Sequence, residues 1–181
     1  MNVRSVHEAM KAKALAAAIS KKVIKGDSSS DPREFDGLQK RLTGKQVITA
    51  GTGSGTALSL KKLDETIDAV MNPTHIICSK AIRRFLSAAA RSQSVGGYIT
   101  YNPDEFGRKV AFYNDLPLLV LEDADGSEIL GFDEAASGAS SPANTASLYV
   151  VSLAPDKMTG IQNGIMDVRD LGELQTKPVF R

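Results

Sequence analysis

The first 25 residues constrain the fold of this 181-residue chain more than any other stretch. No Pro or Gly interrupts them before Gly26, so they predict one helix from about Val3 to Lys25. At about 100° per residue, the apolar side chains form two stripes on nearly opposite sides of this helix. One stripe contains Val3, Val6, Met10, Ala14, Ala17 and Ile24, and the other contains Ala12, Leu15, Ile19 and Val23. An ordinary surface helix has one apolar face, so two stripes predict a helix with partners on both sides.

Basic side chains lie between the two stripes, namely Arg4, His7, Lys11, Lys22 and Lys25. Gly26 is the expected C-cap, and the last lysines suit the negative end of the helix dipole. The basic ridge could be a solvated face, a contact between subunits or a contact with nucleic acid. No aromatic residues are interleaved for base stacking, so a nucleic-acid contact would be to phosphate and not sequence-specific.

A polar turn follows the helix, and Phe35 and Leu38 then return the chain to an apolar surface. We expect Gly37 between them to permit a tight bend. A long helix, a Gly-Asp turn, the run from Glu34 to Leu38 and a short basic-apolar segment at 39–42 follow one another in this order. This order resembles the major capsid proteins of tailed phages, which have the Hong Kong 97-type fold. Residues 73–84 and 167–181 resemble two further segments of these proteins.

The resemblance implies an α+β chain with the Hong Kong 97-type capsid fold. Residues 1–45 would be the spine helix and turn of the peripheral domain, with Phe35, Gly37 and Leu38 at the turn. Residues 46–168 would be the axial domain, whose mixed sheet is flanked by helices at about 59–71 and 79–92. Residues 169–181 would return towards the peripheral domain. The implied function is a structural subunit of an icosahedral phage or prophage capsid, assembled from pentamers and hexamers around double-stranded DNA.

The partners that the resemblance implies are other copies of the chain, with scaffold, portal and decoration proteins as further candidates. Non-specific contact with packaged DNA is compatible with it, and no membrane is involved. The expected location is the virion capsid, assembled in the bacterial host cytoplasm. Residues 134–147, rich in Ala and Ser, are the candidate for a loop at a subunit contact or capsomer centre. Members of the family also have an N-terminal arm and an extended loop before the spine helix, so we expect this chain to be a fragment or a decayed prophage gene.

Hydrophobic periodicity outlines the remaining elements. It predicts a short strand at 46–49, a helix that Ser59 can cap, and a buried strand at 74–78. Ser79 is placed to cap a second helix, whose apolar face contains Ile82, Phe85, Leu86, Ala89 and Ala90. After Gly96-Gly97 the predicted segments are extended: residues 98–101, 108–113, 116–121, 127–132 after a turn at Asp125-Gly126, 147–153 and 164–168.

A glycine-rich loop, Gly51-Thr52-Gly53-Ser54-Gly55, lies between a predicted strand and a predicted helix, where phosphate-binding loops occur. A dinucleotide fingerprint needs a third Gly at position 56, which is Thr, and no Gly-Lys-Ser or Gly-Lys-Thr follows for a P-loop. We interpret the loop as a flexible connection. A small nucleotide-binding α/β enzyme that uses Gly51–Gly55 remains an alternative, as does an encapsulin-like compartment shell protein.

Other possible sites depart from their templates. In the run Asp123 to Glu128 the Gly comes too early for a calcium loop, so a hairpin turn is expected. His7 and His75 are the only histidines, and with Cys78 they cannot supply four zinc ligands without carboxylates. His75 and Cys78 would point to opposite faces of a strand. We therefore predict no catalytic, cofactor-binding or metal-binding residues and a protein that is not an enzyme.

Charge is balanced overall but unevenly placed. The net charge is +1, yet the first 25 residues carry six Lys or Arg against one Glu. No Lys or Arg occurs from Val110 to Asp156, a stretch rich in Asp and Glu. Such polarity could steer subunits together head to tail, or it could be two solvated faces. Cys78 is the lone cysteine, which suits a reducing cytoplasm, and no stretch is apolar enough to span a membrane.

Overall fold

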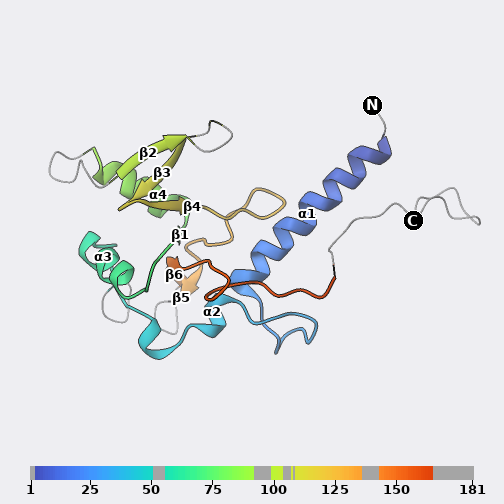
Figure 1. The fold of residues 1–181 in the computed structure, drawn as a ribbon, viewed down its shortest axis with the longest axis horizontal. Coiled ribbons are helices and arrows are strands. Elements are labelled where there is room, and N and C mark those ends of the chain that lie inside the picture. Colours follow the sequence, from blue (N-terminus) through green and yellow to red (C-terminus); the bar gives the residue numbers. More distant parts are fainter. Residues whose placement is uncertain are drawn as a thin grey trace, which may run out of the picture.

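The computed structural model describes residues 3–50, 56–91, 99–103, 107, 109–135 and 143–164 (Figure 1). It has the α+β composition that the sequence predicts, with helices flanking a mixed sheet. The helices are α1 (Val3–Lys25), α2 (Leu38–Arg41), α3 (Leu60–Asp68) and α4 (Lys80–Ala89), with a 3-10 turn at Gly44–Gln46. The strands are β1 (His75–Ile77), β2 (Ile99–Pro103), β3 (Lys109–Tyr113), β4 (Leu116–Leu119), β5 (Glu134–Ala135), β6 (Ala143–Thr145) and β7 (Tyr149–Val151).

Five of the described strands form one sheet in the order β2-β3-β4-β1-β7. β2, β3 and β4 are an antiparallel meander, with Phe112 of β3 opposite Pro117 of β4. β1 then pairs parallel with β4 and antiparallel with β7, so Ile76 lies between Leu118 and Val150. β5 and β6 form a separate antiparallel pair. The strand predicted at 74–78 is therefore a central strand of a mixed sheet.

Successive side chains of β1 pack into two different hydrophobic clusters, because strand side chains alternate between the two faces of a sheet. Ile76 and Cys78 are fully buried among side chains of α3, α4, β3 and β4. Ile77 is buried in a second cluster that contains Ile24, from the end of α1. Helices α3 and α4 thus cover one face of the sheet, and the C-terminal end of α1 contributes to the other.

The two flanking helices form where the sequence predicts them. The Ser79 hydroxyl accepts a hydrogen bond of 3.2 Å from the Ile82 backbone N–H, which is the predicted N-cap of α4. Ser59 occupies the N-cap position of α3 but makes no side-chain cap bond. Ile82 and Leu86 are buried as predicted, whereas Phe85 is 43% exposed and does not join the core. The prediction for Phe85 was wrong because the apolar stripe of α4 is wider than the surface that covers it.

Two predicted strands are absent from the described residues. Residues 46–49 form no strand, because Val47 to Thr49 find no neighbouring strand with which to pair. Asp125-Gly126 does form the predicted turn, with Gly126 at φ 84°, but residues 127–132 contribute only an isolated bridge between Glu122 and Glu128. The predicted strand at 164–168 lies outside the described residues after Gly164. Among the helices that are described, none is both long and apolar enough to cross a membrane.

Candidate functional site: the projecting helix and the groove at its base

The C-terminal end of α1 is fixed to the body of the molecule by one buried side chain. Ile24 is fully buried and packs with Ile77, Tyr149 and Val151 of the sheet and with Leu130. No other residue of α1 is buried. The apolar contribution of α1 to the core is therefore concentrated in its last turn.

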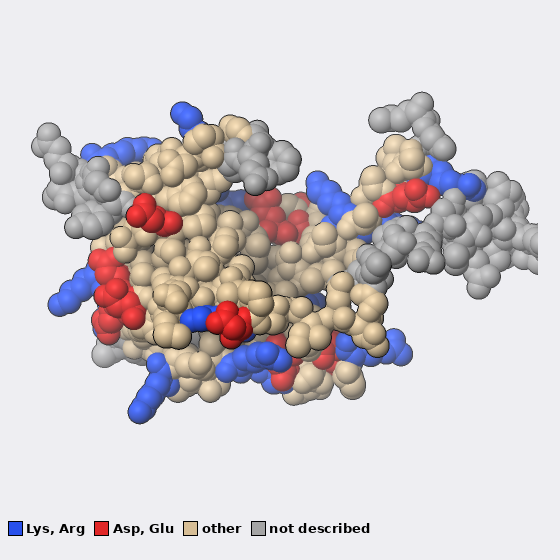
Figure 2. Space-filling model, viewed as in Figure 1, with Lys and Arg blue, Asp and Glu red and all other residues tan. Residues whose placement is uncertain are grey.

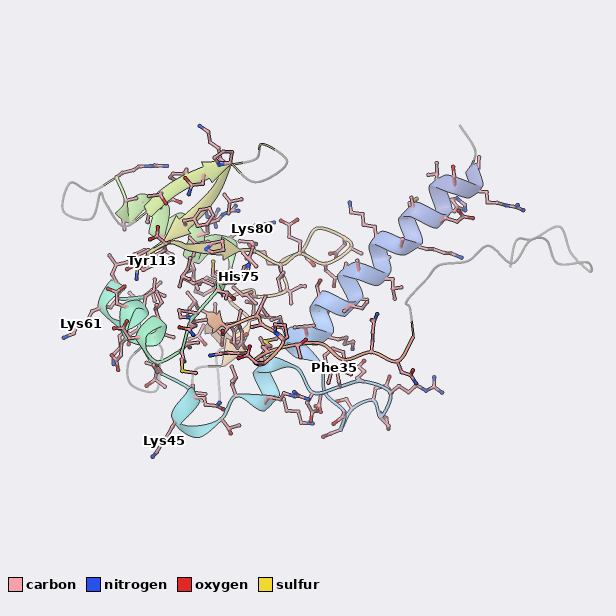
Figure 3. The ribbon with its side chains drawn as sticks, viewed as in Figure 1. Phe35, Lys45, Lys61, His75, Lys80 and Tyr113 are labelled. Atoms are coloured by element: carbon pink, nitrogen blue, oxygen red, sulfur yellow. The ribbon has the colours of Figure 1, made fainter. Side chains whose placement is uncertain are left out.

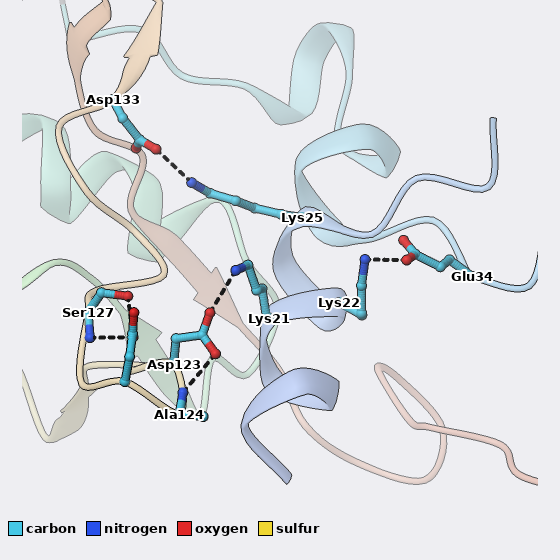
Figure 4. Close-up of polar contacts among 9 residues, drawn as sticks. Lys21, Lys22, Lys25, Glu34, Asp123, Ala124, Ser127 and Asp133 are labelled. Carbon is cyan, nitrogen blue, oxygen red and sulfur yellow. Dashed lines mark hydrogen bonds and ion pairs between the residues drawn. The ribbon is translucent and has the colours of Figure 1, made fainter. Parts of the chain in front are cut away.

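Three lysines of the last two turns make ion pairs around Ile24 (Figure 4). Lys21 Nζ lies 2.6 Å from Asp123 Oδ2, and Lys25 Nζ lies 3.1 Å from Asp133 Oδ2. Lys22 pairs with Glu34 across the turn that follows the helix. The hydrogen bond with Asp123 raises the pKa of Lys21, and the same contact lowers the pKa of Asp123. The paired side chains are partly exposed, so solvent screens these ion pairs and each contributes little to stability.

These ion pairs change the interpretation of the charge polarity. Part of the attraction between the basic helix and the acidic stretch is satisfied within one chain, because Lys21 and Lys25 contact Asp123 and Asp133. Acidic and basic side chains are mixed over the body in Figure 2. The strongly basic part that remains on α1 is its first half, with Lys11 and Lys13 exposed.

The turn after α1 is closed by two glycines that touch backbone. A Cβ on Gly26 would lie 2.3 Å from the Phe35 carbonyl oxygen, and one on Gly37 would lie 2.5 Å from the Ile24 carbonyl oxygen. Gly37 has φ −76°, so any L-residue could adopt its backbone conformation. Both glycines are needed for close approach of two chain segments, and the predicted role of Gly37 in backbone freedom is not the reason for its presence.

A polar network fastens the same turn. The backbone N–H and hydroxyl of Ser28 both donate to Asp36 Oδ1, at 2.9 and 2.7 Å. Lys40 pairs with Asp27 and lies 3.1 Å from Asp36 Oδ1. The Ser28 backbone and hydroxyl bonds, together with Lys40, lower the pKa of Asp36 to about 2. The turn is thus a defined structure that sets the path of the chain from α1 to α2.

The first two thirds of α1 project from the body (Figures 1 and 3). Val3 is 69% exposed, Met10 64% and Leu15 39%, although they belong to the two apolar stripes. For this outer part of α1, the partners predicted on both sides are therefore not supplied by the described part of the chain, whereas Val23 and Ile24 of the last turn do pack on the body. Phe35, at the turn, is also half exposed. A rigid helix with two exposed apolar stripes is a candidate protein-contact surface.

A groove of about 1120 Å³ lies beside the base of α1. It is lined by side chains of α3 and α4, with Lys25 at one side, and by residues 39, 42, 46–50, 56–58, 132–134 and 145–149. Three of its large apolar side chains, Val47, Phe85 and Phe132, are exposed to solvent. The groove is thus a concave surface with a mixed lining, in which exposed apolar side chains lie beside charged ones such as Lys62 and Asp133.

Glu134 provides an unusual polar atom in the groove lining. Its Oε2 accepts a hydrogen bond from the Ser147 hydroxyl, and its backbone oxygen accepts one of 2.8 Å from Thr145 Oγ1. Its Oε1 is buried and has no hydrogen-bond partner among the described residues. Burial and the nearby Glu134 charge raise the pKa of Tyr149, the next aromatic side chain of the lining. A buried carboxylate oxygen without a hydrogen-bond donor is costly to the folded state.

The run from Asp123 to Glu128 is a turn, as predicted. The Asp125 carboxylate accepts two hydrogen bonds from Ser127, and Asp123 accepts from Ala124 N–H and pairs with Lys21. Across the described ranges no three His, Cys, Asp or Glu side chains are grouped to hold a metal ion. Gly51 to Gly55, the alternative nucleotide loop, lies outside the described residues, as do 136–142 of the predicted contact loop and all of 169–181.

His75 and Cys78, the two potentially reactive residues near β1, have structural contacts. His75 Nδ1 lies 2.9 Å from Thr74 Oγ1, which in turn accepts from the Leu153 backbone N–H. Cys78 is fully buried, and this burial raises the pKa of its thiol to about 11. His75 and Cys78 are therefore engaged in holding the central strand and its neighbours together.

Sequence reasoning did not find the groove, because its lining comes from segments far apart in the chain. The signals that were present are the apolar run at Val47-Ile48 without a strand partner and the surplus apolar residue Phe85 on α4. Comparison of the chain with protein-family models, curated proteins and solved structures found no match.

Proposed function

We propose that this chain is a structural subunit that assembles with copies of itself into a closed shell, as a phage or prophage major capsid protein of the Hong Kong 97 type does. The observation that carries the proposal is the projecting part of α1, which exposes Val3, Met10 and Leu15 on a rigid rod. Exposed apolar stripes of this kind mark protein contacts.

The turn after the helix supports the same proposal. The segment from Glu34 to Leu38, which resembles the turn of those capsid proteins, is tightly built in this chain through Gly26, Gly37 and Asp36. A stiff connection between a long helix and an α+β body presents the helix in one direction. Repeated contacts between identical subunits require such a fixed direction, because the symmetry of an assembly depends on one contact geometry. In this proposal the protein has no catalytic role.

Self-assembly can be tested by multi-angle light scattering of the purified chain over a range of concentrations, with negative-stain microscopy of the same samples. We expect the mass to rise with concentration and the images to contain rings or closed shells. A Leu15→Glu and Met10→Glu double variant should lower the assembled fraction, because it places charge on both stripes.

A mass equal to one chain at every concentration, with no particles in the images, would overturn the proposal. Shells that retain proteins instead of DNA when isolated from cells would redirect it to an encapsulin-like compartment. Nucleotide binding by the same monomeric sample, lost in Gly53→Val, would replace it with the nucleotide-binding alternative.

A further inference from the structure

Asn163 and Gly164 are exposed neighbours in the segment that follows β7. We infer that this pair is a site of self-modification, at which the Gly164 backbone nitrogen attacks the Asn163 side-chain amide and converts this asparagine to aspartate and isoaspartate in the folded protein. The inference goes beyond the proposed self-assembly and does not depend on it, because the reaction takes place within one chain and needs only water.

The reaction follows from the covalent structure of an Asn-Gly pair. The Gly164 nitrogen forms a bond to Asn163 Cγ, the bond from Cγ to the amide nitrogen breaks, and ammonia leaves with the proton that Gly164 gives up. Water then adds to one of the two carbonyl carbons of the resulting succinimide ring and opens it to aspartate or isoaspartate. Glycine favours the attack, because it has no side chain to shield its nitrogen and adopts a wide range of backbone conformations.

The structure leaves both partners of this reaction accessible. Residues 159–164 are all exposed, with Ile161 at 95%. Gly164 has φ 92°, and a Cβ built on it would meet no atom of a non-neighbouring residue within 4 Å, so the ring has room to form. Within the described part of the chain, no hydrogen bond engages the Asn163 amide or the Gly164 N–H. Ring closure therefore requires no native contact to break.

The Asp36-Gly37 pair shows how the fold prevents the same attack elsewhere. The Gly37 N–H donates a hydrogen bond of 2.8 Å to the Gly26 carbonyl oxygen, and Asp36 Oδ1 accepts two hydrogen bonds from Ser28. Both the nitrogen and the side chain are therefore held in place. Asp36 is also ionised at neutral pH, and a carboxylate anion resists attack by a nucleophile, whereas the neutral amide of Asn163 does not.

The Asp125-Gly126 pair is held in a similar way. The Gly126 N–H donates a hydrogen bond of 3.0 Å to the Asp123 carbonyl oxygen, and Asp125 Oδ1 accepts from the Ser127 N–H and hydroxyl. These are the two Asp-Gly pairs of the sequence, and Asn163-Gly164 is its one Asn-Gly pair. The most reactive pair by chemistry is thus also the one that the described structure leaves unrestrained.

Modification at Asn163 changes the charge and the backbone of the molecule. Each converted chain gains one carboxylate, which takes the formal net charge from +1 to zero and lowers the isoelectric point. Molecules without net charge repel one another less. Isoaspartate also adds a methylene to the main chain after β7. The protein would therefore accumulate a more acidic form with age.

Peptide mapping of the full chain tests the site. The purified protein is incubated at mildly alkaline pH, which favours loss of the Gly164 backbone proton, and trypsin then releases residues 158–169 for mass spectrometry. We expect conversion at Asn163 to increase with time and to be much faster than at Asn114, which precedes Asp115. Asn163→Gln should remove the acidic form, and Gly164→Ala should form it at least about tenfold more slowly, because the new Cβ shields the nitrogen.

Comparison of folded and unfolded protein tests the contribution of the structure. The rate at Asn163 in buffer should lie within about threefold of the rate in guanidinium chloride, because no native contact has to open first. Stronger protection by the fold would overturn the inference. Equal rates for the natural chain and Gly164→Ala, or conversion at Asn114 as fast as at Asn163, would also overturn it. Methyl transfer from S-adenosylmethionine by an isoaspartyl methyltransferase identifies the isoaspartate product, and its absence from the converted peptide would contradict the succinimide route.

Discussion

The Gly37 backbone N–H donates a hydrogen bond of 2.8 Å to the Gly26 carbonyl oxygen, joining the two ends of the turn that follows α1. The bond brings the segments so close that neither glycine has room for a Cβ. Eleven positions apart in the chain, these residues fix the angle between the helix and the body. The stability of the turn therefore depends on two small residues as much as on the charged side chains around them.

We expect Gly37→Ala to lower the free energy of unfolding by about 1–3 kcal/mol, because the new methyl group would collide with the Ile24 carbonyl oxygen. Urea unfolding followed by circular dichroism measures the change. Gly160→Ala is the matched control, since a Cβ there meets no atom within 4 Å. Equal midpoints for the two variants would show that the turn can open without cost.

Removing the buried anchor of α1 should be far more costly than removing an exposed apolar side chain of the same helix. We expect Ile24→Ala to lower the free energy of unfolding by about 2–5 kcal/mol, because it leaves a cavity between the helix and the sheet. Val3→Ala, at the exposed end, should change it by less than about 0.5 kcal/mol. Similar losses for both would mean that the outer part of α1 packs on the body in solution.

Asp36 makes part of the stability depend on pH. Its pKa is lowered to about 2 in the folded chain from an ordinary 3.8, so the folded state favours the ionised carboxylate. Its stabilising contribution is fully present above pH 3.8 and is lost as the pH falls through about 2. We expect the difference in unfolding free energy between the natural chain and Asp36→Asn to shrink over this window.

Ser28→Ala gives a graded comparison for the same measurement. It removes the hydroxyl donor but keeps the backbone N–H that also bonds Asp36. The pH dependence of its unfolding free energy should therefore be weaker than that of the natural chain and stronger than that of Asp36→Asn. A pH profile of unfolding that is the same in all three proteins would contradict the assigned role of Asp36.

Cys78 should resist thiol reagents in the folded protein. Its side chain is fully buried and burial raises its pKa to about 11, so little reactive thiolate is accessible at neutral pH. We expect modification by iodoacetamide to be slow in buffer and fast in urea. Met71→Cys, at an exposed position, should be modified at once in buffer and serves as the positive control. Rapid modification of native Cys78 would show that β1 and α4 separate readily.

Local sequence patterns predicted the extent of α1, because uninterrupted helix formers and Gly26 define it without help from distant contacts. They also located β1, whose β-branched residues suit a buried strand. They failed at Val47 to Thr49, where the residue types suit a strand but no neighbouring strand is present. A strand needs a partner, and partners are decided by tertiary contacts.

The candidate site shows the same limit. The two apolar stripes of α1 were visible in the sequence, but the exposure of Met10 and Leu15 depends on what the rest of the chain covers. The groove combines segments that are more than 80 residues apart, such as Val47 and Phe132, and no periodic pattern connects them. The unpartnered oxygen of Glu134 likewise follows from the placement of Ser147 and Thr145 around it.

The length of α1 turns small movements at its base into large ones at its tip. With 23 residues it extends about 35 Å, and its buried residue Ile24 and its ion pairs with Asp123, Glu34 and Asp133 lie close to its C-terminal end. A rotation of about 10° at Gly26 would therefore displace Val3 by about 6 Å. The helix is a lever whose bearing is the Gly26–Gly37 turn. Lys21 and Lys25 attach the helix to the body through Asp123 and Asp133. Loss of either ion pair would therefore change the position of the N-terminal end of α1 more than that of its base.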